Sequence, residues 1–563
     1  MSMTERPWPE VPEETARVAR ASFPRGSLPI RVRDSLGPWC QDADFAGLRG
    51  QRGRPGLSPA QLMLVTVLQF TENLTGRQAA DAVRGRTGWK YCLGLEITDQ
   101  GFGFPVLSEF RARLLAGGAG QRPPGLLLAR LREAGLVAAG MRQRTDSARV
   151  LARIRDLNRL ELAGEPVRAA LEALARAEPG WLAGILDPSW QRAYGQRICD
   201  LRLPEGKDAR ARLAAQYARD GCHLLEQAGR PGAPAAARDL PAMRALRLVL
   251  VQQFYRQEGR DGEKVTWRED GEHGLPPGRD RIVSPCDLDA RYGEKRDTRW
   301  LGCKAHYSET ASDPARDDPA AGMPAHPSLI TNTETARACV PGAVMTQVIH
   351  GHLQQAGLPP GEHVTGSGYA SAGALVSSRE QGITLTGPLL ADTSRQARAG
   401  GCTTAMFTIG RDARQATCPQ GTPSTAWSPA SQAGHEVIVV KFPAGACRAC
   451  PARDKCTTAT RTGRQLTIRP RETREAVTAA RAEQETAQWK ARYASRAGVE
   501  GLMRQATHVT GIRRARYPGL PETTLEHSIS AAALNLIRLD DWWTGTPPDR
   551  GHPSNLCQLN LAA

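Results

Sequence analysis

Short strand-like and helical segments alternate between residues 281 and 385, and this alternation constrains the fold more than any other feature of the sequence. Apolar and β-branched residues at a period of two predict strands at 281–283, 300–307, 328–331, 362–365 and 383–385. Helical spacing predicts helices at 343–355 and 372–379 between these strands. Such an alternation is typical of a mixed α/β sheet.

A further strand is expected before this region: an alternating segment, 141–150, follows a Gly-rich break and ends at a polar site. Two stretches of different composition then interrupt the α/β pattern. From Arg153 to about Arg260, Ala, Leu, Arg and Glu recur at helical spacing, which predicts a helical insert. A Gly-, Pro- and Thr-rich region, 389–469, has short β-like pieces at 405–409 and 437–440. A long helix over 471–504 and an apolar helix over 528–539 are expected after it.

The amino-terminal part, from Leu57 to Leu115, has a helical pattern that begins with a Ser-Pro cap and first-turn proline. Further helices are expected at 77–83 and 106–114. Arg84, Arg86 and Lys90 lie near the turns, where they could contact DNA phosphates, although charged helix faces are often only solvated.

The chain is strongly basic. Its 563 residues include 74 Lys and Arg against 58 Asp and Glu, a formal charge of +16, which favours an acidic polymer such as nucleic acid as partner. No run approaches the roughly 18–20 apolar residues that cross a bilayer, and the amino end lacks the apolar stretch of a secretory signal. We therefore expect no membrane role and a cytoplasmic, nucleoid-associated protein, whose thirteen cysteines stay mostly reduced.

One acidic motif lies in the expected helix 471–504. Spacings of three and four place Tyr493, Arg496 and Glu500 on one face. An acid beside a guanidinium on such a face could hold a divalent metal while the arginine meets a phosphate. An ordinary surface ion pair is the alternative.

Several motifs together resemble one family, the bacterial insertion-sequence transposases of the Asp-Asp-Glu kind. The Tyr-x2-Arg-x3-Glu segment that ends at Glu500 resembles the signature around their last acid. The segment 144–151 resembles the one bearing their first aspartate, here Asp146, and 156–162 continues that match. Residues 300–306 resemble their Trp-x-Gly-Tyr-Lys-x-His strand, with Cys303 in the tyrosine position, and 87–91 and 106–111 look like their DNA-binding region.

The resemblance implies an RNase H-like catalytic domain that uses Mg²⁺ or Mn²⁺ for DNA strand cleavage and transfer. Asp146 and Glu500 would hold the metal. Arg496 would orient Glu500 or a phosphate, and Tyr493 would pack beside it or contact DNA. The partners would be double-stranded DNA at terminal inverted repeats and target DNA, bound by a homo-oligomer.

The second acid departs from the family. Where the family usually has Val-Asp-Ser-Gly-Tyr, this sequence reads Thr-Gly-Ser-Gly-Tyr over 365–369, so that Gly366 stands in the position of the aspartate. Two metal ions depend on the carboxylates that hold them, and glycine supplies no ligand. Glu362 lies about 13 Å away along a strand. Other conceivable donors that the spacing does not favour are Asp287, Asp289 and Asp297.

Four cysteines form a second constellation. Cys447 and Cys450 have the Cys-x2-Cys spacing of a usual chelate, and Cys418 and Cys456 would complete four thiolates around a structural zinc. Cys402 is an alternative ligand. The other interpretation is that these are reduced cysteines in an apolar core.

A basic cluster follows Glu500. Arg513, Arg514 and Arg516 are expected to bind phosphates, with Tyr517 stacking on a base, although a solvated loop is the alternative. Lys304 is a further expected DNA contact, with His306 facing the same cleft.

These observations define the expected architecture, an α/β fold with a discontinuous RNase H-like catalytic domain at 139–545. A helical DNA-binding domain at 1–138 precedes it, a helical insert at 156–265 and a β-rich, cysteine-bearing insert at 388–470 interrupt it, and a tail at 546–563 follows. The expected function is a DNA transposase impaired at Gly366. The alternatives are an inactive, transposase-derived DNA-binding protein and a zinc-dependent DNA-binding regulator.

Overall fold

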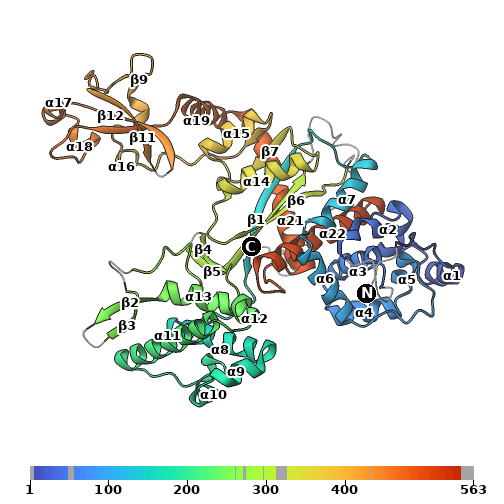
Figure 1. The fold of residues 1–563 in the computed structure, drawn as a ribbon. Helices are drawn as coiled ribbons and strands as arrows, with labels where there is room; N and C mark the ends of the chain where they lie inside the picture. Colours follow the sequence, from blue (N-terminus) through green and yellow to red (C-terminus); the bar gives the residue numbers. More distant parts are fainter. Residues whose placement is uncertain are drawn as a thin grey trace, which may run out of the picture.

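A six-stranded mixed sheet lies at the centre of the computed structural model (Figure 1), which describes residues 5–48, 56–118, 120–259, 262–269, 274–295, 297–311, 326–432 and 434–546. Its strands are β1 (Gln143–Leu151), β4 (Arg291–Lys295), β5 (Thr298–Thr310), β6 (Ile330–Arg337), β7 (Glu362–Thr365) and β8 (Thr384–Thr386). The order is β4-β5-β1-β7-β8, with β6 also paired to β5. β5 is antiparallel to its three neighbours, whereas β1, β7 and β8 are parallel. The mixed α/β fold is therefore confirmed.

Helices cover both faces of this sheet. Ala148, Val150 and Tyr307 point to one face, where they share a core with α21 (Gly498–Gln505) and α22 (Leu520–Trp543). Since side chains alternate along a strand, Thr145 points to the other face. There it bonds His363, whose ring meets His350 of α14 (Gly342–Gln355). The helix α15 (Ala372–Glu380) packs against α14 and β8.

The amino-terminal helices share their core with the sheet domain. They are α1 (Glu13–Ser22), α2 (Leu28–Leu36), η1 (Asp42–Leu48), α3 (Pro59–Thr71), α4 (Gly76–Gly85), α5 (Thr87–Leu93), α6 (Pro105–Ala116) and α7 (Arg122–Glu133). Ser58 caps α3 by accepting the Gln61 amide proton, as the Ser-Pro pattern predicts. α3 is buried along most of its length and packs against α22, and one apolar cluster contains residues of both.

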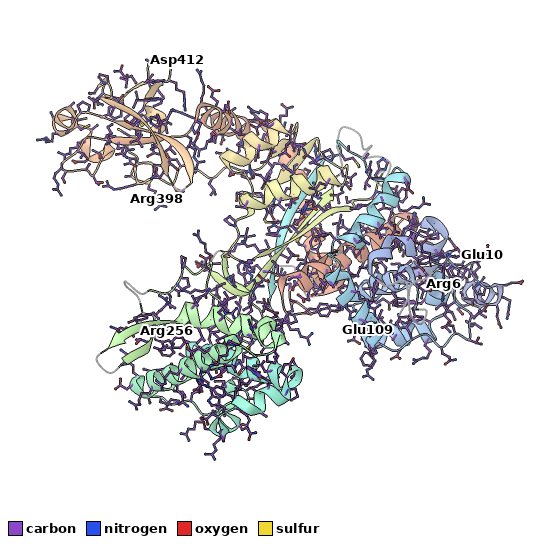
Figure 2. The ribbon with its side chains drawn as sticks, viewed as in Figure 1. Arg6, Glu10, Glu109, Arg256, Arg398 and Asp412 are labelled. Atoms are coloured by element: carbon purple, nitrogen blue, oxygen red, sulfur yellow. The ribbon has the colours of Figure 1, made fainter. Side chains whose placement is uncertain are left out.

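The expected helices after Arg153 form a separate body with its own core (Figure 1). They are α8 (Arg159–Ala177), α9 (Pro179–Ile185), α10 (Pro188–Tyr194), η2 (Ile198–Asp200), α11 (Lys207–Gly229), α12 (Ala235–Asp239) and α13 (Pro241–Gln253). The hairpin of β2 (Phe254–Gly259) and β3 (Gly262–Trp267) follows and packs against α11. Figure 2 shows Arg256 on this hairpin.

The cysteine-bearing region also has its own core and lies at one end of the molecule (Figure 1). Its elements are α16 (Arg395–Arg398), η4 (Thr404–Met406), β9 (Thr408–Gly410), β10 (Gln415–Thr417), β11 (Ala426–Gln432), β12 (His435–Lys441), α17 (Ala444–Ala449), α18 (Arg453–Cys456) and β13 (Gln465–Ile468). Two small sheets, β10-β9 and β11-β12-β13, form it. Arg398 and Asp412 mark this unit in Figure 2.

One local prediction is wrong and another holds only in part. Residues 281–283 form no strand, because Ile282 packs against Leu162 and Val249 of the helical body and its amide bonds the Gln252 side chain. In the β-like piece 405–409, Ala405 and Met406 belong to the turn η4, whereas Thr408 and Ile409 belong to β9 as expected. The tail at 546–563 lies outside the described residues except for its first position.

The expected helix 471–504 is interrupted. It consists of α19 (Arg471–Gln484), α20 (Ala487–Ala494), the short turn η5 (Ser495–Ala497) and α21. Thr486 ends the first segment and caps the second, since its side chain accepts the Trp489 amide proton. In the described part of the chain, no helix is long and apolar enough to cross a membrane.

Candidate active site

The parallel pairing of β1 and β7 sets the geometry of the site. Thr145 lies opposite Thr365 in the last pair of the two strands, so Gly366 continues β7 beside Asp146. A Cβ atom built on Gly366 would lie 3.5 Å from Nε and 3.5 Å from Nη2 of Arg496. A side chain at position 366 would therefore point at the guanidinium group that contacts Asp146.

Arg496 lies between the two acids of the site, Asp146 and Glu500, and contacts both. Its Nη2 donates to Oδ2 of Asp146 at 2.7 Å, and its Nη1 lies 3.4 Å from Oε1 of Glu500. The Asp146 side chain is 16% exposed and that of Glu500 is 73% exposed. One acid is thus held inside the site and the other points largely into solvent, with a single cation between them.

Arg144, which the sequence did not single out, fixes the helical side of the site to β1. Its Nε donates to buried Glu309 at 2.6 Å, and its Nη1 donates to the carbonyl of Ser495 at 2.8 Å. Glu309 also pairs with Arg538 of α22. A Cβ at Gly498 would collide with the Arg144 guanidinium, which explains the glycine between Arg496 and Glu500.

Tyr493 lies beside the acidic pair but in the wall of the site. Its ring stacks on Trp489 with centroids 4.8 Å apart, and burial raises the pKa of its hydroxyl. The packing fixes this ring next to Arg496.

The alternative carboxylates considered from the sequence are engaged or placed elsewhere in the described structure. Glu362 pairs with Arg142 at 2.7 Å and lies 3.4 Å from Arg492. Asp287 accepts the amides of Asp289, Ala290 and Gly519, and Asp289 pairs with Arg337. Asp297 belongs to the turn between β4 and β5.

Lys304 and His306 do not face the cleft that holds Asp146, so this expectation is wrong. On β5 they alternate with Tyr307, the partner of Asp146, and therefore point to the opposite face. Lys304 Nζ donates to the carbonyl of Val340 at 2.8 Å, and burial lowers its pKa. His306 is buried and bonds the Tyr369 hydroxyl at 2.6 Å.

The basic cluster after Glu500 divides into two pairs. Arg513 and Arg514 are exposed. Arg516 is engaged within the protein, where it donates to Asn73 and to the carbonyl of Leu74 and covers the Phe70 ring. Tyr517 lies under Arg111, whose Cζ is 5.4 Å from the ring centroid. The expected DNA contacts of Arg516 and Tyr517 are thus replaced by contacts to the amino-terminal helices. Lys90 is likewise buried and donates to backbone carbonyls.

The cysteines gather in part. Cys402, Cys418, Cys447 and Cys456 belong to one apolar cluster, whereas Cys450 is not among its members. Burial, together with neighbouring Cys402, raises the pKa of Cys456 to about 11. Among the described residues, no three His, Cys, Asp or Glu side chains are grouped so that they could hold a metal ion.

A mixed α/β sheet with this acidic pair, in a basic chain carrying amino-terminal helices, agrees with the class of proteins that rearrange DNA. Two family models match the chain: "Transposase DDE domain" over residues 417–540 and "Transposase domain (DUF772)" over residues 18–113. The two matches lie in separate parts of the chain and support an insertion-sequence DDE transposase. Neither curated proteins nor solved structures gave a match.

A DDE transposase domain implies use of a divalent metal ion and an RNase H-like fold. The residues of this chain do not fit a pair of such ions. Asp146 and Glu500 are the acids of the site, Arg496 already bridges them, and Gly366 has no ligand to offer. Without a carboxylate at position 366, less negative charge offsets the repulsion between two divalent cations held at close range.

Proposed function

We propose that this chain is a DNA transposase that binds double-stranded DNA at the terminal inverted repeats of an insertion sequence, with strand cleavage strongly impaired by Gly366. The observation that carries this proposal is the position of Gly366 beside Asp146, where a Cβ atom would lie 3.5 Å from the Arg496 guanidinium group. The site keeps the first and last acids and their arginine, and lacks only a side chain at the position between them.

The parts of the chain are assigned accordingly. The domain over 139–545 would be the RNase H-like catalytic domain, which agrees with the sheet order β4-β5-β1-β7-β8. The helices over 1–138 would bind DNA, and residues 156–265 and 388–470 would be inserts, each with a core of its own. Target DNA and a homo-oligomer on DNA are further parts of the proposal, as is a place on the nucleoid.

A second candidate is a transposase-derived protein that binds element ends without cleaving them. Arg496 favours it, because this cation already neutralises Asp146 at 2.7 Å. A zinc-dependent regulator is the third candidate and leaves the Asp146–Arg496–Glu500 cluster without a role.

Cleavage assays separate these functions. A supercoiled plasmid carrying element ends is incubated in Mg²⁺ or Mn²⁺ with the protein and with Gly366→Asp. We expect binding by both, very weak cleavage by the first and clear cleavage by the second, abolished when Asp146→Ala is added. Binding without cleavage by either protein would favour the second candidate, and failure of both to bind DNA would reject the proposal.

A structural zinc in the cysteine-bearing unit stays a prediction. The thiols of Cys402, Cys418, Cys447 and Cys456 share a core, but in the described structure they are not arranged as a ligand group. Protein prepared without chelator should contain about one zinc per chain if four thiolates bind it. Zinc-free protein would reject the site.

A further inference from the structure

A groove lies between α11 and the β2–β3 hairpin, within the helical body and outside the acidic site. Its volume is about 920 Å³. Arg212 and Arg219 line it from α11, and Lys264 and Trp267 line it from β3.

The charge of the groove is one-sided. Arg212, Arg219 and Lys264 are exposed, and the described part of the chain shows no ion pair for any of them. Glu269 is the one carboxylate among the lining residues that the structure describes. The nearby acids Asp220 and Glu226 are engaged, since Asp220 accepts from Tyr194 at 2.6 Å and Glu226 lies 3.4 Å from Arg256. Asp220 also interacts electrostatically with Arg219, so Arg212 and Lys264 are the cations left most fully to a ligand of opposite charge.

The spacing of the cations suits a nucleic-acid backbone. Arg212 and Arg219 are seven residues apart on one helix, a rise of about 10.5 Å at 1.5 Å per residue. That distance corresponds to about three steps of a DNA strand at 3.4 Å per step. The two guanidinium groups can thus reach separate phosphates of one strand.

Two neutral donors in the lining have no acceptor. Thr266 Oγ1 and Trp267 Nε1 are buried and lack a hydrogen-bond partner in the described structure. The Trp267 ring is fixed, because it stacks on Phe254 with centroids 6.1 Å apart and Arg159 covers it at 4.7 Å. Both atoms are closed to solvent, and the adjacent positions of Thr266 and Trp267 on β3 turn the two side chains to opposite faces, so the binding capacity of the groove rests on its exposed cations.

We propose that this groove binds the phosphate backbone of duplex DNA, as a second contact separate from the Asp146–Glu500 site. The inference rests on the proposed function, since it assigns to the helical insert a part in holding DNA. The exposed cations select phosphate oxygens and give no base readout, so the contact is independent of sequence.

The test compares duplex binding of three full-length proteins across a salt series, with a short duplex of unrelated sequence as probe. The first is the protein itself, and the second carries Arg212→Ala, Arg219→Ala and Lys264→Ala. The third is a matched control with Arg238→Ala, Arg244→Ala and Arg247→Ala, exposed cations of the same body that do not line the groove. We expect the groove variant to bind at least about tenfold more weakly near 0.1 M salt, with the slope of log K against log salt reduced by about 0.9 per lost phosphate contact.

The control should keep both affinity and slope. Arg212→Lys with Arg219→Lys, which retains the charges, should keep most of the affinity. The groove variant should melt at the same temperature as the protein itself, which separates a lost DNA contact from a folding defect. Equal affinity and equal salt slope for the groove variant and the protein itself would show that the groove does not bind DNA, while leaving the proposed function intact. If the protein itself does not bind duplex DNA, the proposed function fails first.

Discussion

Gly366 lies where a Cβ atom would meet the guanidinium group of Arg496 at 3.5 Å, an ordinary van der Waals separation. An aspartate therefore fits at this position without displacing the backbone, and its carboxylate would extend toward a cation that now serves Asp146. The site thus lacks one negative charge but still has space for an aspartate side chain.

The first prediction concerns Gly366→Asp. Metal-dependent cleavage should rise by about a hundredfold or more, since the change restores an anionic ligand for a divalent ion. The added acid also gains a partner in Arg496, so the free energy of unfolding should not fall. Efficient cleavage by the protein as it is, with no gain from the change, would show that another carboxylate serves.

The second prediction concerns the Asp146–Arg496 pair. Arg496→Ala leaves a largely buried carboxylate without its cation and should destabilise the fold by about 1–3 kcal/mol. The same change in an Asp146→Asn background should cost clearly less, because that site no longer holds a buried charge. Urea unfolding of the protein, the two single variants and the double variant gives the coupling free energy between Asp146 and Arg496. Additive effects of the two changes would contradict an interaction between these residues.

The third prediction separates the two halves of the basic cluster. Arg513→Ala with Arg514→Ala should weaken binding to all DNA sequences and lower the salt slope by up to about 1.8, or 0.9 for each phosphate contact. Arg516→Ala should instead lower the melting temperature, since Arg516 bonds Asn73 and Leu74. An unchanged slope for the double variant would remove Arg513 and Arg514 from the interface.

The fourth prediction is a loss of stability in acid. Burial lowers the pKa of His350 to about 4 and those of His306 and His527 to about 3, and His363 is shifted in the same direction. The unfolded value is about 6.5, so their contribution is complete above pH 6.5 and is lost as the pH falls toward 4, by up to about 1.4 kcal/mol per pH unit for each histidine.

Glu526 acts in the opposite direction. Burial raises its pKa to about 7, so it favours the folded state more as the pH falls. Four histidines outweigh one glutamate, and urea midpoints should therefore fall between pH 7 and pH 5. In His350→Gln this fall should be smaller, and an equal fall would exclude His350 as a source.

The sheet was largely predictable because its strands are local patterns. The alternation at 141–150 and 300–307 and the Ser-Gly-Tyr that follows Gly366 were sufficient to place these segments. The contacts of Arg496 were only half predictable: Glu500 is four residues away in sequence, whereas Asp146 is 350 residues away. Local spacing carries no information about the second contact.

Other errors also arise because tertiary contacts are not visible in the local sequence. Lys304 looked like a DNA contact because cations usually face solvent, but the register of β5 turns it to the opposite face. Arg516 looked free because its partners, Asn73 and Leu74, lie far away in sequence, in the turn between α3 and α4. The interruption of the helix at Thr486 was missed because the surrounding sequence is helical throughout and only the Thr486 hydroxyl, which caps α20, marks the break.

The packing of α22 against α3 has a consequence for synthesis. The core that surrounds α3 includes Ile529, Leu536 and Leu539, so the amino-terminal helices leave the ribosome long before the residues that cover them. Until Leu539 has been made, the apolar side of α3 is open to chaperones and proteases. A premature stop between α21 and α22 would therefore destroy the first part of the protein along with the last, and incomplete chains would be degraded before they could compete for element ends.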